Sequence, residues 1–392
     1  MAATKLVSVG PFHVSLKHEE LCVVSIPPEL VPKAAWWLVR EYSLDQRDKG
    51  GAFNSVILDD DGLSIVCSPL SLSVLENLLQ NNPNMIVSKQ RWKAFIITVI
   101  GWELPGAVYY LADTLSREGM SILHISTFDS EVFLVQEQDV DRACAVLRKT
   151  ENFKEMEREL RMSKQEQRHS NNGDSKVFKE GFELKVLPGN FFLTKLADGA
   201  SLSSCSAALT RLMLFDPRFS TLERVFSKAR QEQPQGQSLM LGITNGRTKS
   251  NSRDRLANLA VEASASATAA SFPPQPPPTQ AQAPTSSGRP ATFMWGLWQC
   301  GSELTLLLDE QDIEAFPEDA LVVSPQRWKV VKLSGRAIEF DETGIVSAMT
   351  SSYDLEAGIS LNISTATTNC SLVPDELLDQ TLETLGAALG TR

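Results

Sequence analysis

The side chains that most often carry catalysis or bind metals are scattered singly along this chain. Histidine and cysteine would be the first candidates for a general base, a nucleophile or a zinc ligand. No CxxC pair and no close His/Cys group occurs among Cys22, Cys67, Cys144, Cys205, Cys300, Cys370, His13, His18, His124 and His169. This spacing argues against a zinc site and a disulfide scaffold, and it predicts buried, reduced cysteines.

Motifs of catalysis and nucleotide binding are also missing from the sequence. It contains no GxxxxGK[ST], GxGxxG, HExxH or GxSxG pattern. Adjacent carboxylates such as Asp341 and Glu342 point to different sides of a strand or turn, so they make a weak acid–base pair. His124 lies within an apolar run and is predicted to be a packed strand residue. We therefore expect a protein that is not an enzyme, with no cofactor and no metal.

The composition is that of a globular protein with no preference for anionic partners. The 392 residues are 42% hydrophobic and 22% charged, with a net charge of −11. This negative charge argues against nucleic acid or an anionic membrane as a partner. The longest apolar runs, such as residues 94–100, are too short to span a bilayer, and the N-terminal residues lack the apolar centre of a signal peptide. We expect a cytosolic protein.

One heptapeptide occurs twice, as VSKQRWK at residues 87–93 and as VSPQRWK at residues 323–329. Ile-Ser-Thr and then Leu-Val follow both copies at nearly the same offset, at 125–127 and 134–135 and again at 363–365 and 372–373. The repeat therefore covers a whole structural unit. Trp92 and Trp328 are each predicted to begin a strand and to pack against neighbouring modules.

The pattern after each heptapeptide predicts strand, helix, strand, strand, helix. In the first copy these elements are residues 94–100, 108–115, 121–126, 131–135 and 140–147, and Gly119 ends the first helix. In the second copy, residues 330–333, 345–349, 359–363, 370–373 and 378–385 follow the same order. This order is typical of the ferredoxin-like βαββαβ fold, an α+β class.

A weaker pattern of predicted strands precedes each copy. The apolar runs 21–26 and 182–187 are each followed by proline, and the strands 55–58 and 304–308 are each followed by an acidic turn. The sequence therefore predicts four small modules in two pseudo-repeated pairs. Their bounds are 8–86 for the first, 87–150 for the second, 181–226 with 291–320 for the third, and 321–392 for the fourth.

Two segments have compositions that do not support a packed core. Residues 151–180 are charged and polar, which predicts a linker between the halves. Residues 227–290 are rich in Ser, Ala and Pro, which predicts a disordered insertion in a loop. The proline run at 273–278 could instead bind an SH3-type or WW-type partner.

Two blocks of the sequence resemble one known family. ISTFDSE at 125–131 with FLVQEQD at 133–139, and FDETGIV at 340–346 with IST at 363–365 and LVP at 372–374, are similar to the CASTOR (GATS-like) cytosolic arginine sensors. The resemblance implies four tandem ACT modules in a cytosolic homodimer, with a free amino acid bound between the second and fourth modules. It also implies an empty sensor that inhibits the GATOR complex of TOR signalling and is released by its ligand.

The resemblance places ligand-binding residues in both repeat copies. Carried over position by position, they are Ser121, Ile122, Glu342, Gly344, Ile345, Val346 and Thr365, with Asn369 and Glu339 at two positions where this chain departs from the family. The Ser121 hydroxyl and backbone N–H groups near Gly344 suit an α-carboxylate. Glu342 suits an α-ammonium.

The two departures change the expected ligand. Arginine-binding members have an aspartate against the guanidinium where this chain has Asn369, and one amide neither cancels the charge nor accepts two parallel hydrogen bonds. Asn369 therefore makes arginine a doubtful ligand. Glu339 replaces a glycine and either rescues a cationic ligand or narrows the cavity. The partner-facing residues implied for the GATOR-type complex are Phe128, Asp129 and Glu131.

The leading hypothesis is thus a non-enzymatic amino-acid sensor that acts through protein interaction. Two alternatives remain open: a ligand-free ACT scaffold, and a regulatory subunit of an amino-acid biosynthetic enzyme.

Overall fold

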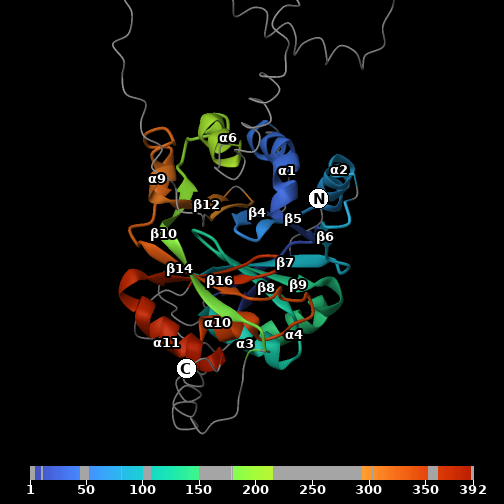
Figure 1. Ribbon diagram of the computed structural model, residues 1–392. Helices are drawn as coiled ribbons and strands as arrows, with labels where there is room; N and C mark the ends of the chain where they lie inside the picture. The colour runs from blue at the N-terminus through green and yellow to red at the C-terminus, as the bar shows by residue number, and fades with distance from the viewer. Residues whose placement is uncertain are drawn as a thin grey trace, which may run out of the picture. The chain divides into compact units, whose positions relative to one another are not determined.

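A computed structural model describes residues 5–9, 12–44, 53–80, 82–99, 107–149, 178, 180–214, 294–301, 303–351 and 361–389 (Figure 1). All of them belong to one unit, Met1–Leu222 with Pro290–Arg392. The 227–290 insertion lies outside the described residues, and so does the 151–180 linker except for Phe178 and Glu180.

The predicted ferredoxin-like modules are present, and two of them are complete in themselves. The first contains β3 (Cys22–Ile26), α1 (Val31–Leu38), β4 (Asn54–Asp59), β5 (Gly62–Cys67), α2 (Pro69–Leu78) and β6 (Ile86–Val87). The third contains the second half of β10 (Glu183–Leu196), α6 (Ser206–Leu214), β11 (Trp295–Cys300), β12 (Glu303–Asp309), α9 (Glu310–Ile313) and β13 (Leu321–Val323).

The second and fourth modules take their last strand from chain that precedes them. The second contains β7 (Trp92–Val99), α3 (Ala107–Arg117), β8 (Ile122–Ser126), β9 (Glu131–Gln136) and α4 (Val140–Lys149). The fourth contains β14 (Trp328–Ser334), α10 (Ile345–Thr350), β15 (Leu361–Ser364), β16 (Asn369–Pro374) and α11 (Leu378–Leu389). Their outer strands are β2 (Phe12–Leu16), which follows β1 (Lys5–Val9) and pairs with β7, and the first half of β10, which pairs with β14.

One path of paired strands folds into two sheets. The path runs β1-β2-β7-β9-β8-β15-β16-β14-β10-β12-β11-β4-β5-β3-β6, and β13 pairs with β10. The strand β10 shifts register between Leu187 and Phe191, so its first half pairs with β14 and its second half with β12. Because β10 passes from one sheet to the other, the second and fourth modules share one sheet, and the first and third share the other.

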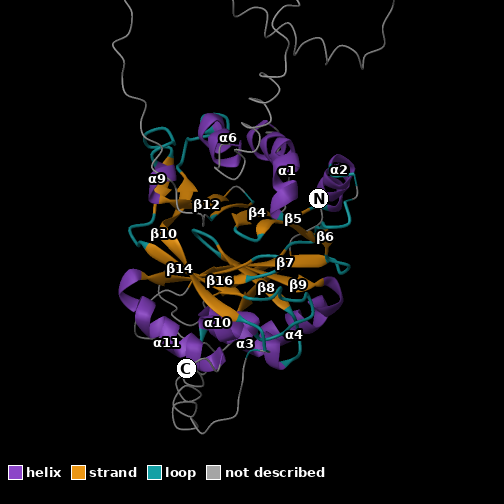
Figure 2. Ribbon diagram, in the orientation of Figure 1, coloured by secondary structure: helices purple, strands orange, loops and turns teal. Residues whose placement is uncertain are grey.

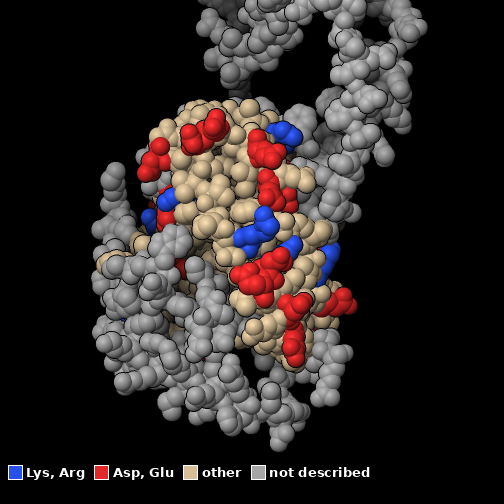
Figure 3. All heavy atoms as spheres, turned by 90° about the vertical axis from the view of Figure 1, so that its left-hand side faces the viewer, with Lys and Arg blue, Asp and Glu red and all other residues tan. Residues whose placement is uncertain are grey.

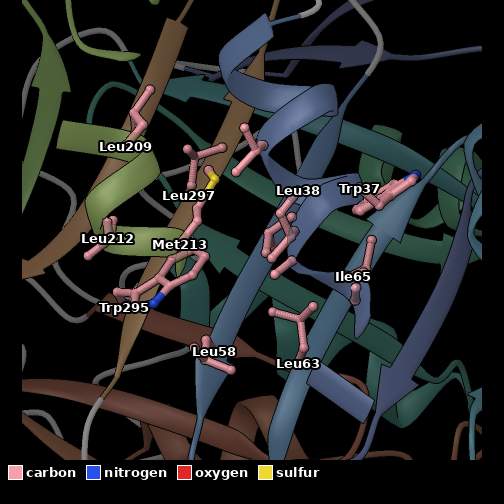
Figure 4. Packing of buried hydrophobic residues seen from close by; sticks show 14 of the residues in the cluster. Trp37, Leu38, Leu58, Leu63, Ile65, Leu209, Leu212, Met213, Trp295 and Leu297 are labelled. Atoms are coloured by element: carbon pink, nitrogen blue, oxygen red, sulfur yellow. The ribbon is translucent and has the colours of Figure 1, made fainter. Parts of the chain in front are cut away.

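The two sheets pack face to face, and helices cover both outer faces (Figure 2). The inner core draws on both sheets, with Ile125 and Ile363 from one and Ile57 and Leu307 from the other. The helices α1, α2 and α6 cover the sheet of the first and third modules, and α3, α4, α10 and α11 cover the other. Figure 4 shows the first of these outer cores, where side chains of α1 and α6 lie over Leu58, Leu63, Ile65, Trp295 and Leu297.

This layered arrangement explains the continuous apolar runs in the sequence. β4 and β5 are buried at every position, because one face of each strand meets helices and the other meets the second sheet. Strands buried on both faces lose the polar–apolar alternation of a half-exposed sheet. The prediction for Trp92 and Trp328 is confirmed, since they begin β7 and β14 and lie in the inner core.

One buried ion cluster joins the first module to the fourth. Lys332 of β14 is 1% exposed, and its Nζ lies 2.9 Å from Asp59, 2.5 Å from Asp60 and 2.7 Å from Asp61. The three carboxylates come from the turn between β4 and β5 and could in principle hold a metal ion. In this structure the ammonium group of Lys332 takes the central position.

The outer surface carries charges of both signs. On the face shown in Figure 3, the described Lys and Arg side chains lie among Asp and Glu side chains and form no continuous basic area. Among the described residues, no helix is long and apolar enough to cross a membrane.

Candidate functional site

The two sheets are each assembled from two modules, but their central seams differ. In the first and third modules, Asn54–Asp59 of β4 pairs with β11 in continuous register from Asn54 opposite Gln299 to Leu58 opposite Trp295. In the second and fourth modules, Ile125 of β8 lies opposite Ile363 of β15, and this is the one backbone pair between the two strands among the described residues. The seam between the second and fourth modules is therefore held by fewer backbone hydrogen bonds.

Side-chain hydroxyl groups replace the missing backbone acceptors. Ser364 Oγ accepts a hydrogen bond from the His124 backbone N–H at 2.9 Å, and Ser126 Oγ accepts one from the Asn362 N–H at 3.0 Å. All four residues are buried. Buried N–H groups need such partners, because an unsatisfied donor costs free energy. This seam thus carries buried polar groups where the other seam has a backbone ladder.

The helix α10 begins close against α3 across the same seam. Gly344 precedes α10 with a φ of 82°, a conformation that favours glycine. A Cβ at Gly344 would lie 3.2 Å from Ser116 Oγ of α3. Val346 and Ile122 share one apolar core. The structure therefore brings Gly344, Val346 and Ile122 together.

Ser121, Ile345 and Thr365 are also buried near this seam. Ser121 comes immediately before β8 and is 6% exposed, and Ile345 faces the core of the fourth module. Thr365 begins the turn after β15, where its hydroxyl contacts Thr368. Because β8 and β15 are antiparallel, this turn lies toward the beginning of β8.

Asn369 is buried but fully engaged with its own module. Its Nδ2 donates to Asn362 Oδ1 at 3.0 Å and to Ser364 Oγ at 2.9 Å, and its Oδ1 accepts from Asn362 Nδ2 at 2.6 Å. The paired amides join β15 to β16 and, through Ser364, reach the His124 backbone N–H. Asn369 is therefore a structural part of the seam as well as a candidate ligand residue.

Glu342 is likewise occupied. Its carboxylate accepts two hydrogen bonds from Arg336, with Nη1 at 2.9 Å and Nη2 at 2.6 Å, and a third from the Glu339 backbone N–H at 3.0 Å. Hydrogen bonding to Glu342 raises the pKa of Arg336 above its usual value. Glu339 is exposed, so its side chain faces away from the buried part of the loop.

The loop that carries Glu342 touches both modules of the seam. The Phe340 ring packs edge-on against Trp92 of the second module at a centroid distance of 6.2 Å. The Phe340 carbonyl accepts a hydrogen bond from Gln136 at 2.8 Å. The loop therefore connects the second module to the fourth through a ring contact and a hydrogen bond.

His124 is a second polar residue of the seam. Its side chain is fully buried, with Nε2 2.9 Å from Glu131 Oε2 and the ring against Phe133 at 4.5 Å between centroids. Its Nδ1 has no hydrogen-bond partner among the described residues. The prediction of a packed strand histidine is confirmed as to its position, and the bare Nδ1 makes it a candidate ligand contact.

The residues implied for partner binding lie against the third module. The Phe128 and Asp129 backbone N–H groups both donate to Glu303, at 3.1 and 3.2 Å. The Asp129 carboxylate lies 2.7 Å from Lys195 Nζ, and this ammonium lies 4.9 Å from the Phe128 ring centroid. Glu131 contacts His124. These contacts fix the turn between β8 and β9 on the opposite sheet.

Sequence reasoning missed Arg336, Asn362 and Ser364. Two signals for the ion pair were available in the sequence. Gly335 stands directly before Arg336, and the acidic Glu342 stands six positions after it. Nothing local in the sequence indicated that Asn362 would face Asn369, since this requires the strand register.

Replacing Asn369 with aspartate is expected to lower the free energy of unfolding by about 1–3 kcal/mol, because the buried carboxylate cannot donate to Asn362 and Ser364. Urea unfolding measures the loss. Asn82→Asp is the matched control, because the Asn82 side-chain oxygen accepts a hydrogen bond from the Asn84 N–H, and an aspartate keeps this bond. Equal stability of the two variants would contradict the amide network.

The chain was compared with protein families and with solved structures. A family model described as ACT domain matches residues 87–149 and 323–387. Among solved structures, the chain is similar to aspartate kinase from Synechocystis at 12% identity and a TM-score of 0.28, covering 96% of this chain and 55% of that chain. It is similar to the regulatory subunit of aspartate kinase from Thermus thermophilus at 12% identity and a TM-score of 0.26, covering 37% of this chain and 99% of that chain.

A protein of unknown function from Vibrio cholerae, described as a possible transport protein, is similar at 15% identity and a TM-score of 0.27, covering 36% of this chain and 91% of that chain. No curated protein sequence matches the chain significantly. ACT domains are regulatory modules that typically bind amino acids. Residues 87–149 and 323–387, which supply the two sides of the seam, belong to the ACT domain family.

Proposed function

We propose that this chain is a non-enzymatic, cytosolic amino-acid sensor that regulates TOR nutrient signalling through ligand-dependent binding to a GATOR-type complex. The observation that supports it is the seam between β8 and β15, where two ACT domains meet with few backbone hydrogen bonds. Residues suited to an amino acid lie on both sides, with Ser121 on one and Gly344 on the other. The resemblance of residues 125–139 and 340–346 to the CASTOR sensors supports the choice of pathway.

The mechanism is a shift between two states. A ligand wedged between α3 and α10 would change how the two domains sit against each other. It can shift the equilibrium only by its differential affinity for the partner-binding and released states. The sensor is proposed to act as a homodimer, which light scattering of the purified chain tests.

Isothermal titration of the full-length protein against each of the twenty common L-amino acids tests the ligand. We expect one or a few to bind, and to change the recovery of GATOR subunits in a pull-down from cell extract. Absence of binding by all twenty removes the sensing function.

Glu342→Ala is expected to abolish the amino-acid response. The variant lacks the only acidic side chain that is buried, among the described residues, in the loop before α10 (residues 335–344, the α10 loop). Recovery of the partner without ligand should be unchanged. Glu310→Ala is the matched control, since Glu310 is an exposed carboxylate that also pairs with an arginine, Arg327. An unchanged response of the Glu342 variant would contradict the assigned site.

One specific observation favours a second function, a ligand-free scaffold. The polar groups of Glu342 and Asn369 are already satisfied within the chain. A scaffold would recover its partner with or without amino acids, and the same pull-down separates the two functions.

A further inference from the structure

The buried carboxylate of the α10 loop is already bound by a cation of the same chain. Arg336 and Glu342 form two parallel hydrogen bonds of 2.9 and 2.6 Å, the geometry in which guanidinium and carboxylate bind most strongly. The Glu342 side chain is 3% exposed, and that of Arg336 is 28% exposed. The carboxylate is therefore inside the protein, and its partner lies between the interior and the solvent.

Arg336 is held in place by the segment that leads into β10. Its Nε donates to the Glu180 carbonyl at 3.3 Å, and its guanidinium carbon lies 3.9 Å from the Phe182 ring centroid. The neighbouring Gly335 has a φ of 95°, and a Cβ there would collide with the Gly181 carbonyl oxygen. The backbone of the α10 loop thus packs directly on residues 180–182, and the arginine is fixed by stacking as well as by charge.

The first repeat copy has no such cation. Arg336 lies eight residues after Trp328, and the residue eight positions after Trp92 is Ile100. The ion pair is therefore particular to the fourth module and is not a general requirement of the repeated fold.

This arrangement decides what the carboxylate can attract. A bare buried carboxylate would draw in a ligand ammonium group, but one neutralised by a bidentate guanidinium carries little net charge. An incoming ammonium group therefore has to replace the guanidinium, whose side chain is partly exposed to solvent.

We propose that Arg336 is a specificity-determining residue of the seam, an internal cation that occupies Glu342 and that a free amino acid must displace. This inference rests on the proposed amino-acid site. It adds that, without a ligand, Arg336 holds the position beside Glu342 that the α-ammonium group of the ligand would take. Arg336 lowers the affinity for every ligand with a free α-ammonium group, so only ligands with enough further contacts in the seam bind.

Titration of the full-length Arg336→Gln variant with each of the twenty L-amino acids tests the proposal. Glutamine removes the charge, and we expect the Kd of at least one amino acid to fall at least about tenfold relative to wild type. The N-acetylated form of that amino acid lacks the ammonium group and should show no gain. Arg327→Gln is the matched control, because it breaks an exposed arginine–glutamate pair between the fourth and third modules and should leave all affinities unchanged.

Phe182→Leu provides an independent variant should Arg336→Gln fold poorly. It removes the ring under the guanidinium and leaves the ion pair, so an intermediate tightening is expected. A Kd at least about tenfold lower for Arg336→Gln than for wild type supports the proposal. Equal affinity of wild type and both variants overturns it but leaves the proposed function standing. Absence of binding by every form overturns both.

Discussion

Replacing Lys332 with methionine is expected to lower the free energy of unfolding by about 3–5 kcal/mol at neutral pH. Lys332 is 1% exposed, and its ammonium group lies within 2.9 Å of three aspartates. Removing it leaves these carboxylates close together, with Lys185 as the one other cation paired with them among the described residues. Urea unfolding of wild type and variant at pH 7.5 measures the loss.

The pH dependence of this loss follows from the shifted pKa values. Although burial opposes it, the charges and hydrogen bonds of the three aspartates raise the pKa of Lys332. The stabilising contribution of Lys332 is therefore present below the ordinary lysine pKa of about 10.4 and is lost as the pH rises above it. Although burial opposes it, hydrogen bonding to Lys185 and Lys332 lowers the pKa of Asp60. The contribution of Asp60 to the free energy of unfolding is therefore lost as the pH falls below about 4. Burial raises the pKa of Asp59, so the charged form of this group is disfavoured in the folded protein. Ionisation of Asp59 therefore lowers the free energy of unfolding, whereas ionisation of Asp60 raises it.

The methionine variant should therefore regain stability relative to wild type in acid. Without the ammonium group, the clustered carboxylates take up protons at a higher pH, and protonation relieves their repulsion. The difference in unfolding free energy between the two proteins should shrink between pH 7.5 and pH 4.5. A difference that stays constant would show that the carboxylates are not the origin of the loss.

Two further substitutions serve as comparisons for the stability loss of Lys332→Met. Lys185 pairs with Asp60 but its side chain is 41% exposed, so Lys185→Met should cost less than about 1 kcal/mol. Ile96 lies four residues after Trp92, as Lys332 lies four after Trp328. Lys332→Ile therefore fits the repeated fold, and it should be as unstable as the methionine variant because the missing charge is the cause.

The second large effect is expected for Trp92→Ala, a loss of about 3–5 kcal/mol. Trp92 is fully buried between the sheets, and its ring contacts Phe340 of the fourth module. Truncation leaves a cavity at a point where two ACT domains meet, and the packed sheets can close it only in part. Urea unfolding reports the stability, and an unchanged slope with denaturant would show that the native state stays equally compact.

A pair of phenylalanine substitutions separates packing from hydrogen bonding. Trp92 Nε1 donates to Ser88 Oγ at 2.9 Å, whereas Trp328 Nε1 has no hydrogen-bond partner among the described residues. Trp92→Phe should therefore cost about 1 kcal/mol more than Trp328→Phe. Equal costs would mean that the indole hydrogen bond contributes nothing.

Much of the local structure was readable from the sequence. The strand at residues 94–100 and the helix at 108–115 are found as β7, Trp92–Val99, and α3, Ala107–Arg117. Gly119, predicted to end that helix, has a φ of 70°. These features follow from apolar spacing and from the conformational range of glycine, which act over a few residues.

Pairing between strands that lie far apart in the chain could not be predicted from the sequence. Both β2 and the first half of β10 complete modules that begin far later in the chain. Any exposed edge of matching polarity could accept such a strand, so local patterning does not select the partner. The same holds for Lys332, whose three aspartates lie some 270 positions earlier in the chain.

The sequence by itself determined a duplicated strand–helix–strand–strand–helix unit, because periodic apolar spacing and a repeated motif are local properties. The candidate ligand residues in both copies came from the resemblance to the CASTOR sensors. Only the tertiary structure decided the state of those residues. It placed Ser121 and Gly344 at one seam, joined Asn369 to Asn362, and set Arg336 on Glu342. Each of these contacts depends on strand register and loop path, which are fixed by packing over the whole molecule.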